Sequence, residues 1–307
     1  MSTTLTHTAA TARRPRTRRK MPLAAAIALI PAALIVLVVY VGCMVWTVRL
    51  SFTSSRLLPK LDFVGMGQYE RLLSNSRFLT SVENIVLFGV LFIAVCLVLG
   101  FLMAVFIDQR VRGEAVFRTI FLYPYSMSFV VTGLVWQWIL NPTLGLEETL
   151  HKFGLTGISV DWVVNRDTVI YALVLAAVWH GAGLVMAILL AGLRGVDADL
   201  YKAARIDGIP PWRYYLSIVL PLLGPMVVTA VVLLAISVAR LYDLVVAMTN
   251  GGPGISSDVP AKFVMDHLFE RSNIGIATAA ATMMLVTVAI ILAPWVYARY
   301  IRPQRQR

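Results

Sequence analysis

Few residues in this chain have the types and spacing that could do chemistry. The clearest candidate is His180, which follows Trp179 in the middle of a long apolar run. An ionisable side chain inside such a run faces the interior of a helix bundle more often than its surface. Together, the histidine and the aromatic ring could hold a polar ligand by hydrogen bonding and ring contact. The alternative, which we favour, is a histidine that is hydrogen-bonded to a neighbouring backbone group.

Polar residues also stand at the ends of apolar runs. Arg240 and Asp243 are three residues apart, so on a continuing helix they can pair and reduce the cost of placing charge there. With Tyr242 they form either part of a ligand pathway or a simple interfacial ion pair, and the sequence does not decide between these two interpretations. Gln137 lies between two tryptophans, a cluster that more often anchors a helix at a membrane surface than stacks on a ligand.

Patterns for catalysis and cofactor binding are missing from the sequence. There is no phosphate-binding G-x-x-x-x-G-K-[ST] motif, no G-x-S-x-G motif, and no His, Cys, Asp or Glu cluster with metal-ligand spacing. The two cysteines, Cys43 and Cys96, both lie in apolar runs, which excludes a disulfide framework. We therefore predict no catalytic residue, no metal and no cofactor in this chain.

The composition defines the environment of these residues. Of 307 residues, 59% are hydrophobic and only 14% are charged, and the mean hydropathy is +0.78. A soluble domain of this length cannot hide so much apolar surface, and long apolar runs rather than alternating strands indicate helices. The formal net charge is +11, but the basic residues gather at the ends of the apolar runs, so we expect no nucleic-acid partner. The predicted fold class is an all-α membrane protein.

Six apolar runs are long enough to cross a membrane. They form one predicted transmembrane domain over residues 22–300, between a disordered basic tail at 1–21 and a short tail at 301–307. The first run is too long for a secretory signal peptide, so it stays as a span. The third contains Pro124, which a span tolerates when neighbouring groups satisfy the freed carbonyl. The predicted spans cover about residues 22–47, 84–107, 120–140, 168–193, 216–239 and 274–297.

Basic residues predict the orientation of these spans. The two tails and the loops 108–118 and 194–215 carry 17 of the 27 Lys and Arg residues, whereas the other three loops carry nine. Positive charge accumulates on the cytoplasmic side of membrane proteins. We therefore expect both termini and the 194–215 segment to lie in the cytoplasm.

The segment 199–225, between the fourth and fifth predicted spans, organises the remaining candidates. A helix is expected from 198 to 207, because Asp197 can cap its first backbone N–H groups and Gly208 suits the left-handed residue that ends a helix. Pro210 and Pro211 cannot continue that helix but can begin the next one. Two short helices that meet at a sharp bend make a rigid projection for a partner outside the bilayer.

Several motifs, in order, resemble those of one transporter family. Residues 201–208 (YKAARIDG), Trp212 and the Ile-Val-Leu-Pro that ends at Pro221 resemble the EAA–G–LP motif of permease subunits of bacterial ATP-driven importers. Tyr242-Asp243 with the Thr-Asn-Gly-Gly-Pro of 249–253 resembles the D…T-x-G-G-P stretch of the carbohydrate branch, the maltose-type first permease. The FVG…Y of residues 63–69 resembles its FVGLxNY element, and the motifs together cover about residues 22 to 300.

The resemblance implies a type I ABC importer permease fold, with six transmembrane helices and a cytoplasmic coupling helix. It also implies a bacterial inner-membrane location, a second permease subunit, an extracytoplasmic solute-binding protein and a sugar substrate. Two partner ATPase subunits would bind ATP and Mg, so this chain would not itself be an enzyme. The residues carried over to ATPase coupling are Leu200, Tyr201, Lys202, Ala203, Ala204, Arg205, Asp207, Gly208 and Pro221.

Within the predicted coupling helix, small residues and charge have separate roles. Leu200, Ala203, Ala204 and Asp207 are spaced three to four apart and share one face, where the alanines allow a partner to approach closely. Lys202 stands where the family has a glutamate, so we expect docking to rest on shape rather than on a salt bridge at this position. An ordinary amphipathic connector on the membrane surface is the alternative.

Two other classes of function are less consistent with this sequence. A secondary transporter, driven by an ion gradient, would want inverted repeats or membrane-buried carboxylates, but Asp and Glu fall in loops or at span ends. A membrane-surface scaffold has only the basic tails in its favour.

Residues 259–264 (VPAKFV) resemble the family subset that handles glucose, mannose or glucosides. The Gly-Gly-Pro of 251–253 is either part of a receiving surface for the binding protein or a connecting turn.

Overall fold

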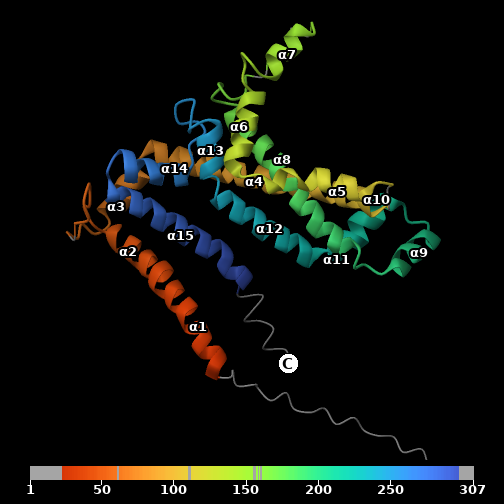
Figure 1. The fold of residues 1–307 in the computed structure, drawn as a ribbon, viewed down its shortest axis with the longest axis horizontal. Helices are drawn as coiled ribbons and strands as arrows, with labels where there is room; N and C mark the ends of the chain where they lie inside the picture. Colours follow the sequence, from red (N-terminus) through yellow and green to blue (C-terminus); the bar gives the residue numbers. More distant parts are fainter. Residues whose placement is uncertain are drawn as a thin grey trace, which may run out of the picture. The chain divides into compact units, whose positions relative to one another are not determined.

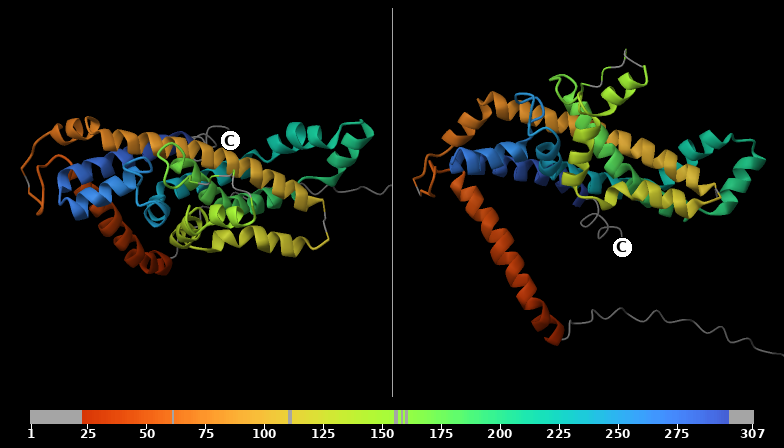
Figure 2. Two further views of the ribbon diagram at one scale, coloured as in Figure 1. Left: turned by 90° about the horizontal axis from the view of Figure 1, so that it is seen from above. Right: turned by 45° about the horizontal axis from the view of Figure 1, so that its top comes forward.

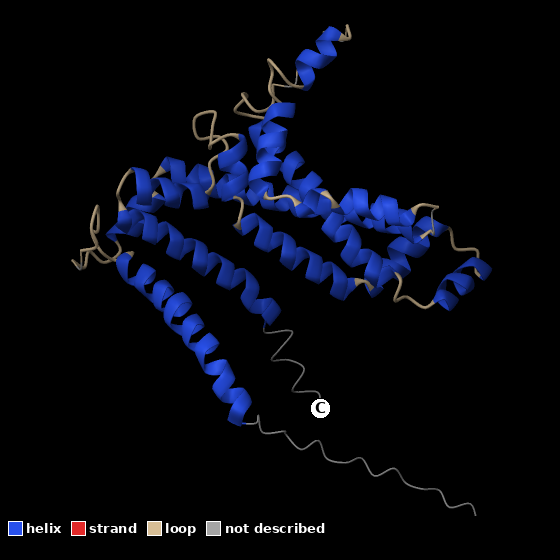
Figure 3. Ribbon diagram, in the orientation of Figure 1, coloured by secondary structure: helices blue, strands red, loops and turns tan. Residues whose placement is uncertain are grey.

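The computed structural model describes residues 23–60, 62–109, 112–154, 157, 159 and 161–296. The predicted tails at 1–21 and 301–307 lie outside these residues. Within the described part, every regular element is a helix, and one isolated bridge joins Thr53 to Phe63 (Figure 3). The predicted all-α class is confirmed.

The chain divides into two compact units, residues 1–46 and 47–307. The first contains α1 (Leu23–Ile35) and the π-helical η1 (Val36–Val41), and α2 (Gly42–Leu50) spans the division. Large apolar side chains of α1 and η1, such as those of Leu34 and Leu37, are exposed. Such a surface is suited to lipid rather than to water.

Two helices form the centre of the second unit. α4 (Ser76–Asp108) and α8 (Val169–Leu193) run side by side, and most of α8 is buried (Figures 1 and 2). The Asn75 side chain begins α4 by accepting hydrogen bonds from the second and third backbone N–H groups after the cap, at 3.0 and 3.3 Å. The two helices approach closely because Gly100 of α4 has no side chain. A Cβ atom at this position would lie only 2.6 Å from side-chain carbons of Val185 in α8.

The predicted third span is interrupted. The chain forms α5 (Glu114–Leu122), a 3₁₀ turn, η2 (Pro124–Ser126), and α6 (Phe129–Ile139). Pro124 has no N–H to continue a helical ladder, and Met127 and Ser128 are both extended, with ψ of 155°. The Ser128 hydroxyl then begins α6 by accepting a hydrogen bond from the Val131 N–H at 3.3 Å.

The predicted fifth span is bent. Its axis turns by 75° between residues 211–222 and 224–239. Pro221 and Pro225 flank the turn at Leu223, and neither can donate a backbone hydrogen bond, which explains the break. The elements of this part of the chain are α9 (Ala198–Ile206), α10 (Pro211–Tyr214), the π-helical η3 (Tyr215–Val219), α11 (Leu220–Leu222) and α12 (Gly224–Ala239).

A smaller core holds the N-terminal end of α4. Its buried side chains come from α3, α4, α14 and α15, and they are Leu72, Phe78, Phe263, Ala279 and Ala280. The remaining elements are α3 (Gly67–Leu73), α7 (Leu146–Lys152), α13 (Tyr242–Met248), α14 (Pro260–Met265), the π-helical η4 (Asp266–Glu270) and α15 (Ile274–Val296).

α4 separates two groups of elements (Figure 1). α3 and α14 lie at its N-terminal end, and α9 and α10 lie beyond its C-terminal end. α4 has 33 residues, which at 1.5 Å per residue gives a length of about 50 Å. The hydrocarbon core of a bilayer is about 30 Å thick, so α4 is long enough to cross it with one group of elements at each end.

Three helical segments in the described residues are long and apolar enough to cross a membrane: Leu29–Leu50, Ser76–Asp108 and Val169–Leu193. The bent pair of 211–222 and 224–239 is a fourth if it counts as one span, and Phe129–Ile139 and Ile274–Ile290 are shorter apolar helices. These segments indicate a multi-pass membrane protein. The predicted number of six spans stays a prediction.

Candidate functional site

The ends of α9 are set by local side-chain and backbone chemistry. Asp197 caps the helix by accepting a hydrogen bond from the Asp199 N–H at 2.9 Å. Gly208, with φ of +71°, reverses the chain, and the Ile209 N–H then bonds the Ala204 carbonyl at 2.9 Å. Pro211 begins α10 directly afterwards. The predicted helix, bend and second helix are all present, with α9 ending at Ile206, one residue before the predicted end.

Most of the α9 surface is exposed. Ala204 alone among its residues is buried, and the Tyr201 ring packs edge-on against Tyr214 of α10, with ring centroids 5.2 Å apart. The four residues predicted to share a docking face therefore do not all face outward, because Ala204 belongs to the core of this chain. Within the segment of α9 and α10, the most exposed large apolar side chains are instead Ile206, at 86%, and Trp212, at 66%.

The lysine that replaces the family glutamate is paired within α9. Lys202 Nζ lies 2.8 Å from a carboxylate oxygen of Asp199, and both side chains are more than two-thirds exposed. A pair of this kind contributes little to stability in water. Its effect is local: the Lys202 charge is balanced inside the helix. Arg205 and Asp207 are also exposed, and Pro221 lies in α11 at the bend of the fifth predicted span.

A cavity of about 1070 Å³ lies between α9 and the bundle. Glu114 and Arg194 lie on its wall and form an ion pair at 2.5 Å that joins α5 to the end of α8. Other walls come from Asp108 at the end of α4, from Asp197, and from tyrosines of α9 and α10. α9 therefore rests on the bundle through a few side chains, with open space behind it.

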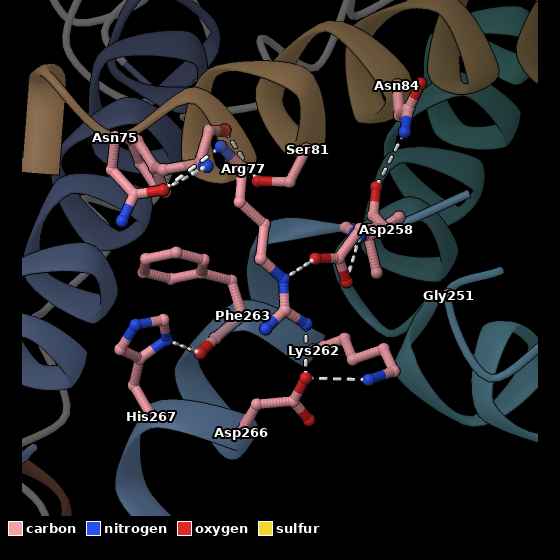
Figure 4. A network of polar contacts seen from close by, with 12 residues as sticks. Asn75, Arg77, Ser81, Asn84, Gly251, Asp258, Lys262, Phe263, Asp266 and His267 are labelled. Atoms are coloured by element: carbon pink, nitrogen blue, oxygen red, sulfur yellow. Dashed lines mark hydrogen bonds and ion pairs between the residues drawn. The ribbon is translucent and has the colours of Figure 1, made fainter. Parts of the chain in front are cut away.

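At the opposite end of α4, the structure brings together four charged residues that the sequence analysis did not single out (Figure 4). Arg77 Nε lies 2.5 Å from Asp258, its guanidinium also bonds Asp266, and Lys262 Nζ lies 2.7 Å from Asp266. The four side chains are 17% exposed or less, and their formal charges cancel. Mutual pairing is what makes their burial tolerable. The four-residue spacing of Lys262 and Asp266, which places both on one helix face, was the available sequence signal.

Two titratable groups near this network have shifted pKa values. Burial alone would raise the pKa of Asp266, but the hydrogen bonds and charges of Lys262 and Arg77 outweigh it and lower the pKa overall. Burial lowers the pKa of His267, whose Nδ1 lies 3.0 Å from the Phe263 carbonyl. The carboxylate is thus held charged and the imidazole is held neutral.

His180 and Trp179 both contact α6 but differ in burial and partners. His180 is buried, its Nδ1 lies 3.2 Å from the Thr132 hydroxyl of α6, and its ring stacks on Phe129 at 4.5 Å. The favoured interpretation named a backbone partner; the partner is a side chain of another helix instead. Trp179 is 36% exposed and packs against Trp136, whose buried indole N–H has no hydrogen-bond partner among the described residues.

The expected pair of Arg240 and Asp243 is not formed. α12 ends at Ala239 and α13 begins at Tyr242, so the helix does not continue through these positions, and no ion pair joins the two residues in the described part of the chain. Both side chains are exposed. Gln137 is half-buried on α6. Across the described residues, no group of three or more His, Cys, Asp or Glu could hold a metal.

Comparison with known proteins identifies the class of this chain. The family model of the binding-protein-dependent transport system inner membrane component matches residues 98–302. The chain belongs to this family. The prediction of a permease subunit of a binding-protein-dependent ABC importer is confirmed by this match.

Relatives cover almost the whole chain. A probable ABC transporter permease protein of Pyrococcus horikoshii is 34% identical over 274 residues, which are 89% of this chain and 94% of that protein. The xylose/arabinose import permease protein XacH of Haloferax volcanii is 31% identical over 275 residues, 88% of this chain and 86% of that protein.

A solved structure has the same fold. It is a bacterial alginate ABC transporter in complex with an alginate pentasaccharide-bound periplasmic protein, one chain of which matches with a TM-score of 0.76 and 19% identity over 91% of this chain and 95% of its own length. The likeness supports the type I ABC importer permease fold predicted for this chain.

Proposed function

We propose that this chain is a membrane-spanning subunit of an ATP-driven sugar importer and that α9 couples it to a cytoplasmic ATPase. The observation that carries the proposal is the form of α9: a capped and sharply terminated helix that projects from the bundle with most of its surface uncovered. A helix that needed no partner would bury an apolar face against its own chain. Exposed Ile206 and Trp212 are suited to a protein groove.

The complete importer would contain a second permease subunit, two ATPase subunits and an extracytoplasmic binding protein. Membership of the binding-protein-dependent family supports the extracytoplasmic binding protein as a partner. ATP and Mg would be bound by the ATPase subunits, and this chain would lack catalytic residues. The solved alginate transporter, which was captured with a periplasmic protein, supports the same arrangement.

A carbohydrate is the proposed substrate class. XacH is a xylose/arabinose import permease, and the solved structural relative carries alginate. Candidate positions for a polar substrate remain those of the sequence analysis, with the Trp136–Trp179 pair and its free indole N–H as the best supported. The candidates are Trp179, His180, Arg240, Tyr242, Asp243 and Gln137.

We further propose six spans with both termini in the cytoplasm. Three long helices, one bent pair and two shorter apolar helices supply the segments that six spans require. The excess of basic residues in the tails and in the loops 108–118 and 194–215 supports this orientation. In this orientation the exposed coupling residues of α9 and its end face the ATPase, and the buried Ala204 packs behind them in the core of this chain. The exposed residues are Leu200, Tyr201, Lys202, Ala203, Arg205, Asp207 and Gly208.

Reconstitution tests the proposal. The chain, its second permease and its ATPase are purified together and placed in proteoliposomes, and uptake of labelled xylose, arabinose, maltose and glucose is measured. We expect uptake of at least one sugar that needs both enclosed ATP and added binding protein. Uptake that persists without the ATPase subunits but needs a proton or sodium gradient would show a secondary transporter instead.

A further inference from the structure

The loop of residues 249–259, between α13 and α14, is fixed within itself and against α4. The Thr249 and Ser257 hydroxyls bond each other at 2.7 Å, and Ser257 also donates to the Gly252 carbonyl at 2.6 Å. The Asn84 side chain of α4 donates to two carbonyls of the loop, those of Ser256 and Asp258, at 3.0 and 2.9 Å. Backbone groups that would otherwise leave a loop mobile are satisfied here.

Arg77 joins α4 to the C-terminal end of this loop and to the helical segment that follows it (Figure 4). Its guanidinium bonds Asp258 at the end of the loop and Asp266 in η4, and Lys262 of α14 completes the set by pairing with Asp266. Asp258 is 1% exposed and so depends on Arg77 for its counter-charge. Without the guanidinium, the two carboxylates would repel each other and the loop would lose its ionic link to α4.

The turn at the start of the loop packs directly on this network. Gly251 has a φ of +82°, and a Cβ there would lie 3.1 Å from the aliphatic carbons of Lys262. Asp266 fixes the Lys262 side chain by their ion pair, and the Lys262 side chain in turn packs against the turn at Gly251. Most of the loop is covered; its exposed residues are Asn250 and, at the tip, Gly254 and Ile255, and none of them carries a charge.

We propose that Arg77 is a positioning residue that holds the 249–259 loop in one conformation to receive the extracytoplasmic binding protein. The inference rests on the proposed function: with α9 on the cytoplasmic side, the loop at the opposite end of α4 would face the extracytoplasmic binding protein. A preformed loop loses less conformational freedom when a partner binds than a mobile one does. Because the tip is uncharged, recognition there depends on shape and on backbone groups, which a displaced loop would present wrongly.

Uptake by the reconstituted importer, measured against the concentration of binding protein, tests this role. Arg77→Met is expected to raise the half-saturating concentration about tenfold, which corresponds to about 1.4 kcal/mol, and to change the maximal rate much less. Arg77→Lys, which keeps the charge, is expected to restore part of the affinity. Arg71→Ala, which removes an exposed arginine of α3 six residues earlier, is the matched control and should behave as wild type.

A second variant separates positioning from mere stability. Arg77→Met with Asp258→Asn restores neutrality, because Lys262 and Asp266 still pair. We expect this double variant to recover the thermal stability and yield of the complex but to keep the raised half-saturating concentration. The role of Arg77 would be overturned if the double variant recovered both stability and the wild-type half-saturating concentration of binding protein. It would also be overturned if Arg77→Met alone had the wild-type half-saturating concentration. A wild-type complex that ignores the binding protein would instead overturn the proposed function, and this control is measured first.

Discussion

A Cβ atom on Gly183 would clash with the backbone carbonyl oxygen of Phe121. This contact brings α5 directly onto α8, the most buried helix of the described chain. The obstacle is backbone rather than the end of a flexible side chain, so no rotamer change can relieve it. α5 can approach α8 this closely only because residue 183 has no side chain.

Gly183→Ala is therefore expected to destabilise the purified permease by about 3 kcal/mol, the upper part of the range for overpacking. Thermal unfolding in detergent, followed by tryptophan fluorescence, measures the change. Gly42→Ala is the matched control, because no atom lies within 4 Å of the added Cβ and alanine favours helix. Equal effects of the two substitutions would contradict the close contact.

Ile206→Glu is expected to weaken association with the ATPase without loss of permease stability. Ile206 is 86% exposed, so a charge there meets only water until the partner covers it. A charged side chain in a protein groove loses its hydration, and we expect a tenfold or greater loss of ATPase affinity, about 1.4 kcal/mol or more. Co-purification of the ATPase at graded salt and protein concentrations gives the measurement.

Phe153→Glu provides the control for Ile206→Glu. Phe153 is 82% exposed but lies at the end of α7, far from α9 in the chain. It should leave ATPase association unchanged. If both variants bind ATPase as wild type does, Ile206 is not at the interface.

Stability should fall as the pH decreases from 7.5 to 5.5. Burial, with repulsion from Arg271 and Arg77, lowers the pKa of His267 below its usual value, despite opposing effects of Phe263 and Asp266. The unfolded chain then takes up a proton near pH 6.5 while the folded chain does not, so stability is lost as the pH falls through that value. The melting temperature of the purified permease should drop by a few degrees.

His267→Gln should flatten this dependence, since glutamine does not titrate. Asp266 does not contribute in the same window: its pKa is lowered, so its stabilisation is complete above about pH 4 and is lost only at lower pH. A pH profile that is as steep in His267→Gln as in wild type would assign the effect to another group.

Thr132→Val is expected to cost about 1–3 kcal/mol, because it leaves a nitrogen of the buried His180 ring without its partner at nearly unchanged volume. Combining it with His180→Phe should recover part of the loss, as a double-mutant cycle in thermal unfolding would detect. The half-saturating sugar concentration should stay that of wild type. A large change in that concentration with little loss of stability would place His180 in the substrate pathway.

Local chemistry made α9 predictable from the sequence. The cap at Asp197, the left-handed Gly208 and the start of α10 at Pro211 each depend on residues within a few positions, and the structure has all three. The breaks in the third and fifth predicted spans were harder, because whether a proline kinks a helix or ends it depends on which neighbours satisfy the freed groups.

Contacts between distant residues lay beyond sequence reasoning. Arg77 bonds partners 181 and 189 residues away, and only the spacing between Lys262 and Asp266 indicated a shared helix face. The partners of adjacent residues were no easier to predict. Trp179 and His180 both contact α6, one turn apart: Trp179 packs on Trp136, and His180 lies against Thr132.

The most direct test of coupling through α9 is the number of ATP molecules hydrolysed per sugar taken up, measured in the same proteoliposomes. Gly208 has φ of +71° and open space around it, so replacements there differ in backbone preference rather than in fit. Asparagine tolerates this conformation and valine does not, at a cost of about 1–2 kcal/mol. We predict a wild-type ratio for Gly208→Asn and a raised ratio, or hydrolysis without uptake, for Gly208→Val in an intact complex. A wild-type ratio in Gly208→Val would contradict the assignment of α9 as the coupling element.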